Sequence, residues 1–283
     1  MFVTRFAPSP TGPLHLGHAF SALLAHDQAR AAGGTFLLRI DDLDQSRSRR
    51  SWEDQIFEDL DWLGVSWDGP VRRQSEHFDD YKAVIASMAE QGVIYPCRCK
   101  RRDIEAALSA PQEDGSRNTP RFGPDGLVYP GTCKGRRYED RLPTDALRFD
   151  IDKAELDPLP SFTEIGPLHA GEHQLTMGYL QSKVGDPVIA RAQMAASYHL
   201  SVVLDDAASQ VTHVIRGADL FEATFIQRML QRHLRVQSPT YYHHKLIRDE
   251  AGKRLAKRDD ARAIAKYRAE GATPGDIRHM VGL

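Results

Sequence analysis

The first hundred residues alternate between short apolar runs and stretches with a helical spacing of apolar positions. An apolar run at residues 2–3 leads into a turn rich in proline and glycine at residues 8–13. Beyond the turn, apolar residues recur every three or four positions and predict a helix. They are Leu16, Ala19, Phe20, Leu23 and Leu24. Residues 35–40 follow a Gly-Gly pair typical of a helix end, and they predict a second, buried strand.

The same alternation continues through the rest of the chain. Amphipathic patterns predict helices at residues 51–63 and 78–91, each followed by a glycine, and another at residues 221–234. Strands are predicted for three further segments: 145–152, 198–206 and 211–219. Strands that alternate with helices predict an α/β fold built on a doubly wound parallel sheet.

The composition is that of an ordinary globular protein without a membrane segment. The 283 residues are 41% hydrophobic and 27% charged, enough to bury one large or two modest cores. No window is long and apolar enough to span a bilayer, and no signal-peptide pattern opens the chain. Three cysteines, all between Cys97 and Cys133, argue against a disulfide framework and predict a reducing, cytoplasmic setting.

Candidate chemistry begins where the first predicted strand, turn and helix meet. The N-terminus of that helix offers unpaired backbone N–H groups, which favour phosphate. His15 and His18 lie three residues apart in its first turn, and Gly17 between them leaves the backbone open to a flat purine. The alternative is a proline-rich loop that caps a helix carrying two surface histidines.

Charged residues follow two of the predicted strands. Asp41, Asp42 and Asp44 come directly after strand 35–40, where open α/β sheets place ligand sites. Alternatively, Asp42 and Asp44 do no more than cap the next helix. Arg216 ends strand 211–219, and the pattern alone predicts an arginine paired with a nearby acid. The candidates for that acid are Asp205, Asp206 and Asp219.

The segment from residue 96 to 143 is crowded with arginine, lysine, glycine and proline, and residues 110–126 predict a loop. Cys97, Cys99 and Cys133 all lie in this segment. Three thiolates suit tetrahedral zinc, and a small segment without its own core gains most from a structural metal. Because Cys-x-Cys is a tight pair and no fourth cysteine or histidine lies here, three unconnected thiols remain the alternative.

A basic segment lies near the C-terminus. Nine lysines or arginines and four acids fall between residues 245 and 268. Such a run is either a solvated face or a surface for phosphate or RNA. Because the net charge of the whole chain is −2, an RNA partner requires a local basic surface of this kind.

Residues 5–18 resemble the HIGH signature of class I aminoacyl-tRNA synthetases in its glutamyl and glutaminyl form. The resemblance implies a Rossmann-like catalytic domain in which His15, Gly17 and His18 bind ATP and the two histidines are catalytic. It also implies that glutamate is bound by these residues: Arg5, Phe6, Ala7, Pro8, Ser9, Asp41, Tyr198 and Arg216. In the family, the first acid after the second strand holds the substrate's amino group, and the arginine pairs with a carboxylate.

Two further segments are similar to parts of this family. Residues 253–259 resemble the KMSKS loop, which makes Lys257 a catalytic, ATP-binding lysine, although Ala256 departs from the usual serine. The segment 96–143 is similar to the zinc insertion of the glutamyl subgroup, in which a tyrosine four residues before the last cysteine completes the site. The implied ligands of this structural zinc are Cys97, Cys99, Tyr129 and Cys133.

The resemblance implies four regions and a particular reaction. The regions are residues 1–95 (first half of the catalytic domain), 96–143 (zinc-binding insertion), 144–240 (acceptor-like insertion and second half) and 241–283 (KMSKS-like loop and helical segment). Only 25 residues follow Arg258, whereas full-length relatives continue with an anticodon-binding region. The chain therefore resembles the glutamyl-queuosine subgroup, which activates glutamate and passes it to queuosine of aspartate tRNA.

This interpretation implies L-glutamate, ATP with Mg²⁺, and the queuosine-carrying anticodon stem-loop of tRNA(Asp) as partners of a monomeric ligase. Two alternatives stay open. One is a truncated glutamyl-tRNA synthetase that charges the 3′ end of tRNA. The other is a catalytically inactive module that binds zinc and RNA.

Overall fold

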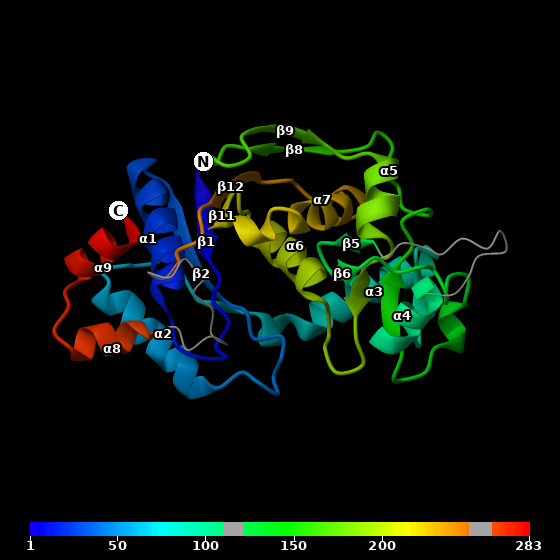
Figure 1. Ribbon diagram of the computed structural model, residues 1–283, viewed down its shortest axis with the longest axis horizontal. Helices are drawn as coiled ribbons and strands as arrows, with labels where there is room; N and C mark the ends of the chain where they lie inside the picture. The colour runs from blue at the N-terminus through cyan, green and yellow to red at the C-terminus, as the bar shows by residue number, and fades with distance from the viewer. Residues whose placement is uncertain (110–120, 249–261) are drawn as a thin grey trace.

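The computed structural model describes residues 1–109, 121–248 and 262–283, which form a mixed α/β structure (Figure 1). Lys257 and Ala256 lie outside the described residues, as does most of the basic segment around them. The same holds for the first part of the predicted loop 110–126. No helix in the described ranges is long and apolar enough to cross a membrane.

A largely parallel layer of strands runs through the molecule in the order β3-β2-β1 and β11-β12-β8-β9. These strands are β1 (Val3–Phe6), β2 (Thr35–Ile40), β3 (Arg72–Arg73), β8 (Ser161–Glu164), β9 (Gly171–Gln174), β11 (His213–Gly217) and β12 (Thr240–His244). All pair in parallel except β9, which is antiparallel to β8. The backbones of Val3 and Thr212 join the two halves, because each N–H donates to an oxygen of the other residue at 2.9 Å.

A smaller antiparallel sheet lies apart from this layer, and the sequence did not predict it. Its strands are β4 (Ile94–Cys97), β7 (Ala146–Phe149) and β10 (Val188–Ala190), with β7 in the centre. A two-stranded hairpin, β5 (Phe122–Gly123) and β6 (Gly126–Leu127), ends the segment that was predicted to be a loop. Its Pro124-Asp125-Gly126 turn, with Gly126 at φ 91°, is a turn signal that is equally typical of longer loops.

Helices cover both faces of the parallel layer, which confirms its doubly wound character. The helices are α1 (Leu16–Ala31), α2 (Arg50–Trp62), α3 (Phe78–Glu90), α4 (Arg101–Ser109), α5 (Met177–Tyr179), α6 (Tyr198–Ala208), α7 (Ala223–His233), α8 (Ile264–Ala269) and α9 (Pro274–Val281). Short 3₁₀ or π turns are η1 (Gln74–His77), η2 (Tyr138–Asp140), η3 (Leu180–Val184) and η4 (Ala218–Leu220). Val214 and Tyr241 lie in the core that holds α3, α6 and α7, whereas Ile215 and Tyr242 face the core that holds α1, α2, α8 and α9.

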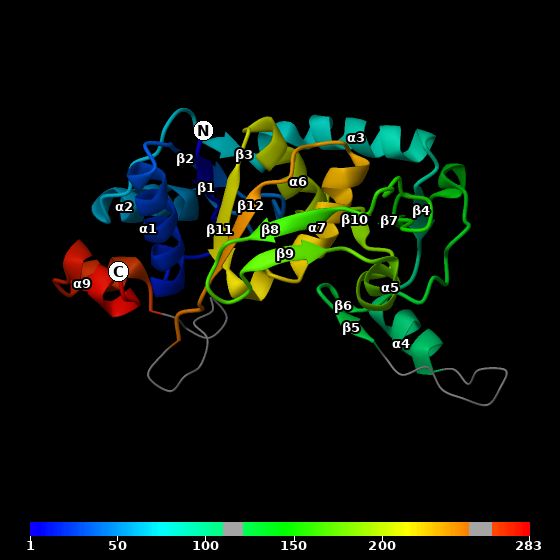
Figure 2. The ribbon, with the colours of Figure 1, turned by 90° about the horizontal axis from the view of Figure 1, so that it is seen from above.

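The molecule is elongated, with different elements at its two ends. Helices α8 and α9 lie beside α1 and α2 at one end, and α4 with the β5–β6 hairpin lies at the other (Figures 1 and 2). Arg278 of α9 makes a bidentate ion pair with Asp27 of α1, at 2.7 and 2.9 Å. The short helical segment predicted for the C-terminus is therefore packed onto the half of the molecule that contains α1.

The predicted strand at residues 198–206 is wrong, because these residues form helix α6. Ser197 caps its N-terminus, and its side chain accepts a hydrogen bond from the N–H of Leu200. The helix is buried on most of its circumference, so apolar residues occur in a continuous run instead of at helical spacing. A run of this kind has the same appearance in a buried strand and in a buried helix.

Candidate active site and cysteine cluster

A cavity of about 580 Å³ opens at the carboxyl ends of β1, β2 and β11. Every predicted glutamate- or ATP-binding residue that the structure describes lines it. They are Arg5, Phe6, Ala7, Pro8, Ser9, His15, Gly17, His18, Asp41, Tyr198 and Arg216. This edge of a parallel sheet is where α/β folds bind ligands, and the cavity collects residues from distant parts of the chain.

The two histidines at the start of α1 hold each other in place. His15 is the N-cap, and its Nδ1 accepts a hydrogen bond from the N–H of Gly17 at 3.1 Å. The Nδ1 of His18 accepts one from the backbone N–H of His15 at 3.2 Å, and the ring centroids lie 3.8 Å apart. Because each Nδ1 accepts, a neutral ring carries its proton on Nε2, which is then a donor. A Cβ at Gly17 would lie 3.0 Å from the His15 ring, so a larger residue would crowd that ring.

Four buried charged side chains form a network in the wall of the cavity. The Arg5 guanidinium donates to both oxygens of Asp206, at 2.8 and 3.2 Å. Arg39 bridges two acids, donating to Asp206 at 2.6 Å and to Asp41 at 2.6 Å. Burial raises the pKa of Asp41, with Arg39 opposing the shift. Burial also acts on Asp206, but Arg5 and Arg39 outweigh it and hold the pKa of that carboxyl below its usual value.

Arg39, which lines the cavity, and Asp206, which pairs with it, were not among the predicted site residues. Arg39 is 4% exposed within the apolar strand β2, and a buried arginine requires a counter-charge. An arginine within an apolar strand was therefore the feature of the sequence that could have indicated a buried ion pair. The position of its partner Asp206 could not be inferred, because residues 198–206 were predicted to be a strand.

Arg216 also lines the cavity, from β11, and its partners are neutral. It donates to His243 Nε2 at 3.0 Å, Gln227 Oε1 at 2.8 Å, Thr224 Oγ1 at 2.8 Å and the carbonyl oxygen of Leu220 at 3.2 Å. Across the described residues, no carboxylate lies within ion-pair distance of its guanidinium. The pairing with Asp205, Asp206 or Asp219 that the pattern alone predicted is therefore wrong.

The segment that contains Lys257 leaves from and returns to this cavity. Leu246 and Ile247, shortly before it, line the cavity, and so does His244, which contacts Ser21 of α1 at 2.8 Å. After it, Ala263 pairs with His15, and the N–H of Ile264 donates to the carbonyl oxygen of Leu14 at 2.9 Å. The described residues just before this segment therefore line the cavity, and Ala263 just after it pairs with His15.

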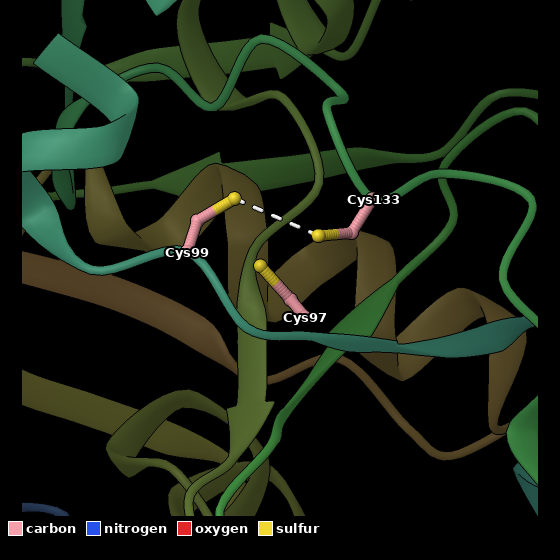
Figure 3. A group of neighbouring side chains, drawn as sticks. All are labelled: Cys97, Cys99 and Cys133. Atoms are coloured by element: carbon pink, nitrogen blue, oxygen red, sulfur yellow. Dashed lines mark hydrogen bonds between the residues drawn. The ribbon is translucent and has the colours of Figure 1, made fainter. Parts of the chain in front are cut away.

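The three cysteines come together at the far end of the molecule, with their Sγ atoms pointing toward one another (Figure 3). All three Sγ atoms lie within 4.8 Å of one another, and Cys99 and Cys133 are 3.6 Å apart. The hydroxyl of Tyr129 lies 3.4 Å from the Sγ of Cys97 and 3.5 Å from that of Cys99. A tetrahedral zinc with sulfur and oxygen ligands has ligand–ligand distances of about 3.5–3.8 Å, so the four groups fit such an ion.

The thiols of this cluster differ in pKa. Burial raises the pKa of Cys99 to about 11. Burial also acts on Cys133, but hydrogen bonds from the Arg98 backbone and the Tyr129 hydroxyl outweigh it and lower its pKa to about 7. The thiolate is the form that binds metal, and a bound cation would favour it at every sulfur.

Comparison with known proteins agrees with the geometry of the cavity. The family model for tRNA synthetases class I (E and Q), catalytic domain, matches residues 1–283. A glutamate tRNA ligase from Elizabethkingia meningosepticum, solved in complex with its amino acid, is similar in structure with a TM-score of 0.75 at 25% identity. The match covers 100% of this chain and 60% of that chain. The chain belongs to the class I tRNA synthetases of the glutamyl and glutaminyl type, which are ligases.

Closer relatives define the family within this class. A protein of Rhodobacter capsulatus is 58% identical over 284 residues, covering 99% of this chain and 100% of the relative. A protein of Symbiobacterium thermophilum is 39% identical, covering 100% of this chain and 87% of the relative. Both are called Glutamyl-Q tRNA(Asp) synthetase, and the chain belongs to their family.

Proposed function

We propose that this chain activates L-glutamate with ATP and transfers the glutamyl group to queuosine, the modified wobble base of tRNA(Asp). The observation that carries the proposal is the single cavity, which holds candidate groups for an amino acid and for a nucleotide side by side. The names of the relatives support glutamate and tRNA(Asp) as the substrates.

Glutamate has three charged groups, and the cavity offers a partner for two of them. The guanidinium of Arg216 suits the side-chain carboxylate, because its four hydrogen bonds to described residues leave its positive charge and one of its five N–H groups for a ligand. Asp41 suits the ammonium group, since its carboxylate is fixed by Arg39 at 2.6 Å. Tyr198 and the segment from Arg5 to Ser9 line the space between. The α-carboxylate is thereby left to react with ATP.

In the activation step, an α-carboxylate oxygen of glutamate attacks the α-phosphorus of ATP. The bond from that phosphorus to the bridging oxygen breaks, and pyrophosphate leaves. Negative charge grows on the phosphate oxygens, which the Nε2–H groups of His15 and His18 and the ammonium group of Lys257 stabilise. Mg²⁺ enters with ATP, as it does in class I synthetases.

In the transfer step, a hydroxyl of the acceptor attacks the carbonyl carbon of the adenylate, and AMP leaves. The cyclopentenediol of queuosine carries a cis-diol like that of a terminal ribose. The pocket could therefore act on queuosine without any additional catalytic group. Anticodon loops present unstacked bases, which proteins bind more readily than an A-form stem. Exposed basic residues at the start of α4 support the binding of flanking phosphates. They are Arg98, Lys100, Arg101 and Arg102.

An isolated anticodon stem-loop tests the acceptor. A queuosine-carrying stem-loop of tRNA(Asp) should accept labelled glutamate from the full chain, and the same stem-loop with guanine at the wobble position should not. Nuclease digestion of labelled full-length tRNA(Asp) should place glutamate on that one nucleotide. Label on the 3′-terminal adenosine would instead support a glutamyl-tRNA synthetase, and no pyrophosphate exchange with glutamate would support an inactive module.

The same proposal includes one structural zinc per chain, held by Cys97, Cys99, Tyr129 and Cys133. The separations of 3.4, 3.5 and 3.6 Å among these groups are compatible with a tetrahedral ion, and four protein ligands would leave no position open for catalysis. The ion would join β4 to the loop that carries Cys133, in a segment whose buried apolar cluster is small.

Metal analysis of the purified chain should find about one zinc per molecule. Cys133→Ser should lose the metal and expose the insertion to proteolysis, while glutamate-dependent pyrophosphate exchange continues. Full retention of zinc by Cys133→Ser, or a folded native protein without zinc, would contradict the site.

A further inference from the structure

Three arginines line the cavity, and Arg216 differs from the other two in its partners. Arg5 and Arg39 are each ion-paired directly with a carboxylate of the protein. Arg216 is 6% exposed, yet its four hydrogen bonds all go to neutral acceptors. A buried guanidinium without a counter-charge is costly, so the surroundings of Arg216 must offset its charge by another route.

The counter-charge lies behind His243. The His243 ring is fully buried on β12, and its Nδ1 lies 2.5 Å from Oε2 of Glu164, which is 1% exposed on β8. The other carboxylate oxygen, Oε1, accepts from the N–H of His243 at 2.9 Å and from that of Gly166 at 2.6 Å. Glu164 is therefore a fixed acceptor, with both oxygens engaged.

Which of these groups can donate and which can accept determines the protonation states in the hydrogen-bonded series Glu164–His243–Arg216. An arginine only donates, so His243 Nε2 must accept from it at 3.0 Å. The ring proton is then on Nδ1, which donates to Glu164. Burial and the neighbouring Arg216 lower the pKa of His243, although Glu164 opposes the shift. The ring is accordingly neutral, and the carboxylate of Glu164 carries the negative charge.

We propose that Glu164 and His243 are positioning residues that orient Arg216 and neutralise its charge from one residue further away, leaving the guanidinium available to the substrate's side-chain carboxylate. A protein carboxylate in direct contact, like Asp206 on Arg5, would compete with the substrate for the same donors. Gln227 and Thr224 fix the remaining orientation, at 2.8 Å each. This inference rests on the proposed role of Arg216 in binding glutamate.

The arrangement favours glutamate over glutamine as substrate. A guanidinium whose immediate partners are neutral gains most from a ligand that brings a negative charge, and a neutral amide cannot supply it. If Glu164 and His243 set this preference, weakening either should reduce affinity for glutamate much more than affinity for glutamine.

Pyrophosphate exchange with the full chain measures this effect through the KM values for glutamate and for ATP. Glu164→Gln keeps the shape of the side chain and removes its charge, whereas His243→Phe removes the acceptor for Arg216. Each should raise the glutamate KM roughly 10- to 100-fold, while kcat and the ATP KM change little. Weak competitive inhibition by glutamine should change less than the glutamate KM does. His243→Gln, which keeps one acceptor and one donor, should recover most of the affinity.

A matched control and a double variant separate positioning from stability. Tyr95→Phe removes a buried hydrogen bond to Asp186 (2.6 Å) away from the cavity, and it should lower thermal stability without raising the glutamate KM. In an Arg216→Ala background, Glu164→Gln should add nothing to the glutamate KM.

Three results have distinct meanings. If Arg216→Ala raises the glutamate KM but Glu164→Gln and His243→Phe do not, this inference fails and the proposed function stands. If Arg216→Ala itself leaves the glutamate KM unchanged, the proposed role of Arg216 fails, and the inference fails with it. A parallel rise in the KM values for glutamate and ATP would mark the pair as purely structural and overturn the inference.

Discussion

The charged residues of the cavity differ in how they are ion-paired within the protein, and this difference determines which ligand group each can bind. Asp206 accepts from both Arg5 and Arg39, so two cations share one carboxylate, while Arg39 also binds Asp41. The wall formed by these four side chains is neutral overall, since two arginines face two aspartates. An ammonium ligand beside Asp41 would supply positive charge that stabilises the ionised carboxylate against its burial. Arg216 on β11 has no carboxylate partner among the described residues and keeps positive charge for a ligand carboxylate.

Lys257 is predicted to act on the rate of activation and not on the binding of glutamate. Its partner is the pyrophosphate leaving group, whose charge grows mainly in the transition state. Lys257→Ala should therefore lower kcat for pyrophosphate exchange roughly 100-fold, with little change in the glutamate KM. Steady-state exchange kinetics check this, with Arg216→Ala as the opposite case. A rise confined to the glutamate KM would make the KMSKS assignment of Lys257 wrong.

Single residues were predictable where their chemistry is local in the sequence. His15, Gly17 and His18 lie within one helical turn, and the three cysteines lie in one segment. All of these come together in the structure as expected. The partners of Arg216 were not predictable, because Glu164 and His243 reach it from separate strands whose side-by-side order in the sheet no local pattern specifies.

At the scale of secondary-structure elements, a buried acid lies between α2 and α8. Asp59 of α2 is fully buried, and neither of its carboxylate oxygens has a hydrogen-bond partner in the described parts of the chain. The nearest cation is Arg268 of α8, at 3.8 Å, which also contacts Glu58. Burial raises the pKa of Asp59 to about 6, with Arg268 opposing the shift.

The raised pKa makes stability fall as pH increases. The folded state holds this proton up to about pH 6, whereas the unfolded chain loses it near the usual value of 3.8. Between those values folding takes up a proton, so the ionised carboxylate destabilises the protein at neutral pH. Asp59→Asn should raise the free energy of unfolding at pH 8 by at most roughly 3 kcal/mol, and by much less at pH 4.5.

Urea unfolding at the two pH values measures this difference. Asp61→Asn is the matched control, because Asp61 lies on the exposed side of the same helix and should show no such pH-dependent gain. An equal gain for Asp59→Asn at both pH values would mean that hydrogen bonding of the amide, and not removal of charge, is responsible.

Helices and strands with a clear local apolar pattern were predicted more accurately than elements that are buried on several sides. Strand β2 and helix α2 were predicted almost to the residue, since one is a short apolar run and the other has a single apolar face. Helix α6 contacts both α7 and α3 and is buried on several sides, so its periodicity is hidden. The antiparallel sheet of β4, β7 and β10 was missed because strand partners far apart in sequence leave no local pattern.

At the scale of the whole molecule, the two halves of the parallel layer meet at the cavity. The first half contributes the histidines, Arg5 and Asp41, and the second contributes Tyr198 and Arg216. The Arg5–Asp206 pair joins them directly, as do two hydrogen bonds between Val3 and Thr212, one of them to the threonine hydroxyl. The parallel sheet and the location of the site were predictable from the order of strands and helices, whereas the contacts that join the halves were not.

This assembly bears on whether activation requires RNA. The described groups proposed for glutamate and for ATP are already in one cavity, oriented by hydrogen bonds and ion pairs within the chain. Groups that are oriented before the reaction need no further ordering when the substrates bind. We therefore expect labelled pyrophosphate to exchange into ATP with protein, glutamate and Mg²⁺ alone, and addition of tRNA(Asp) to change the rate by less than roughly tenfold. RNase-treated protein provides the control, because RNA carried through purification would otherwise supply a hidden cofactor. If exchange appears only with tRNA, the cavity must be completed by RNA binding. Lys257 would then be the first residue to examine, since Ile247 before its segment lines the cavity and Ala263 after it pairs with His15.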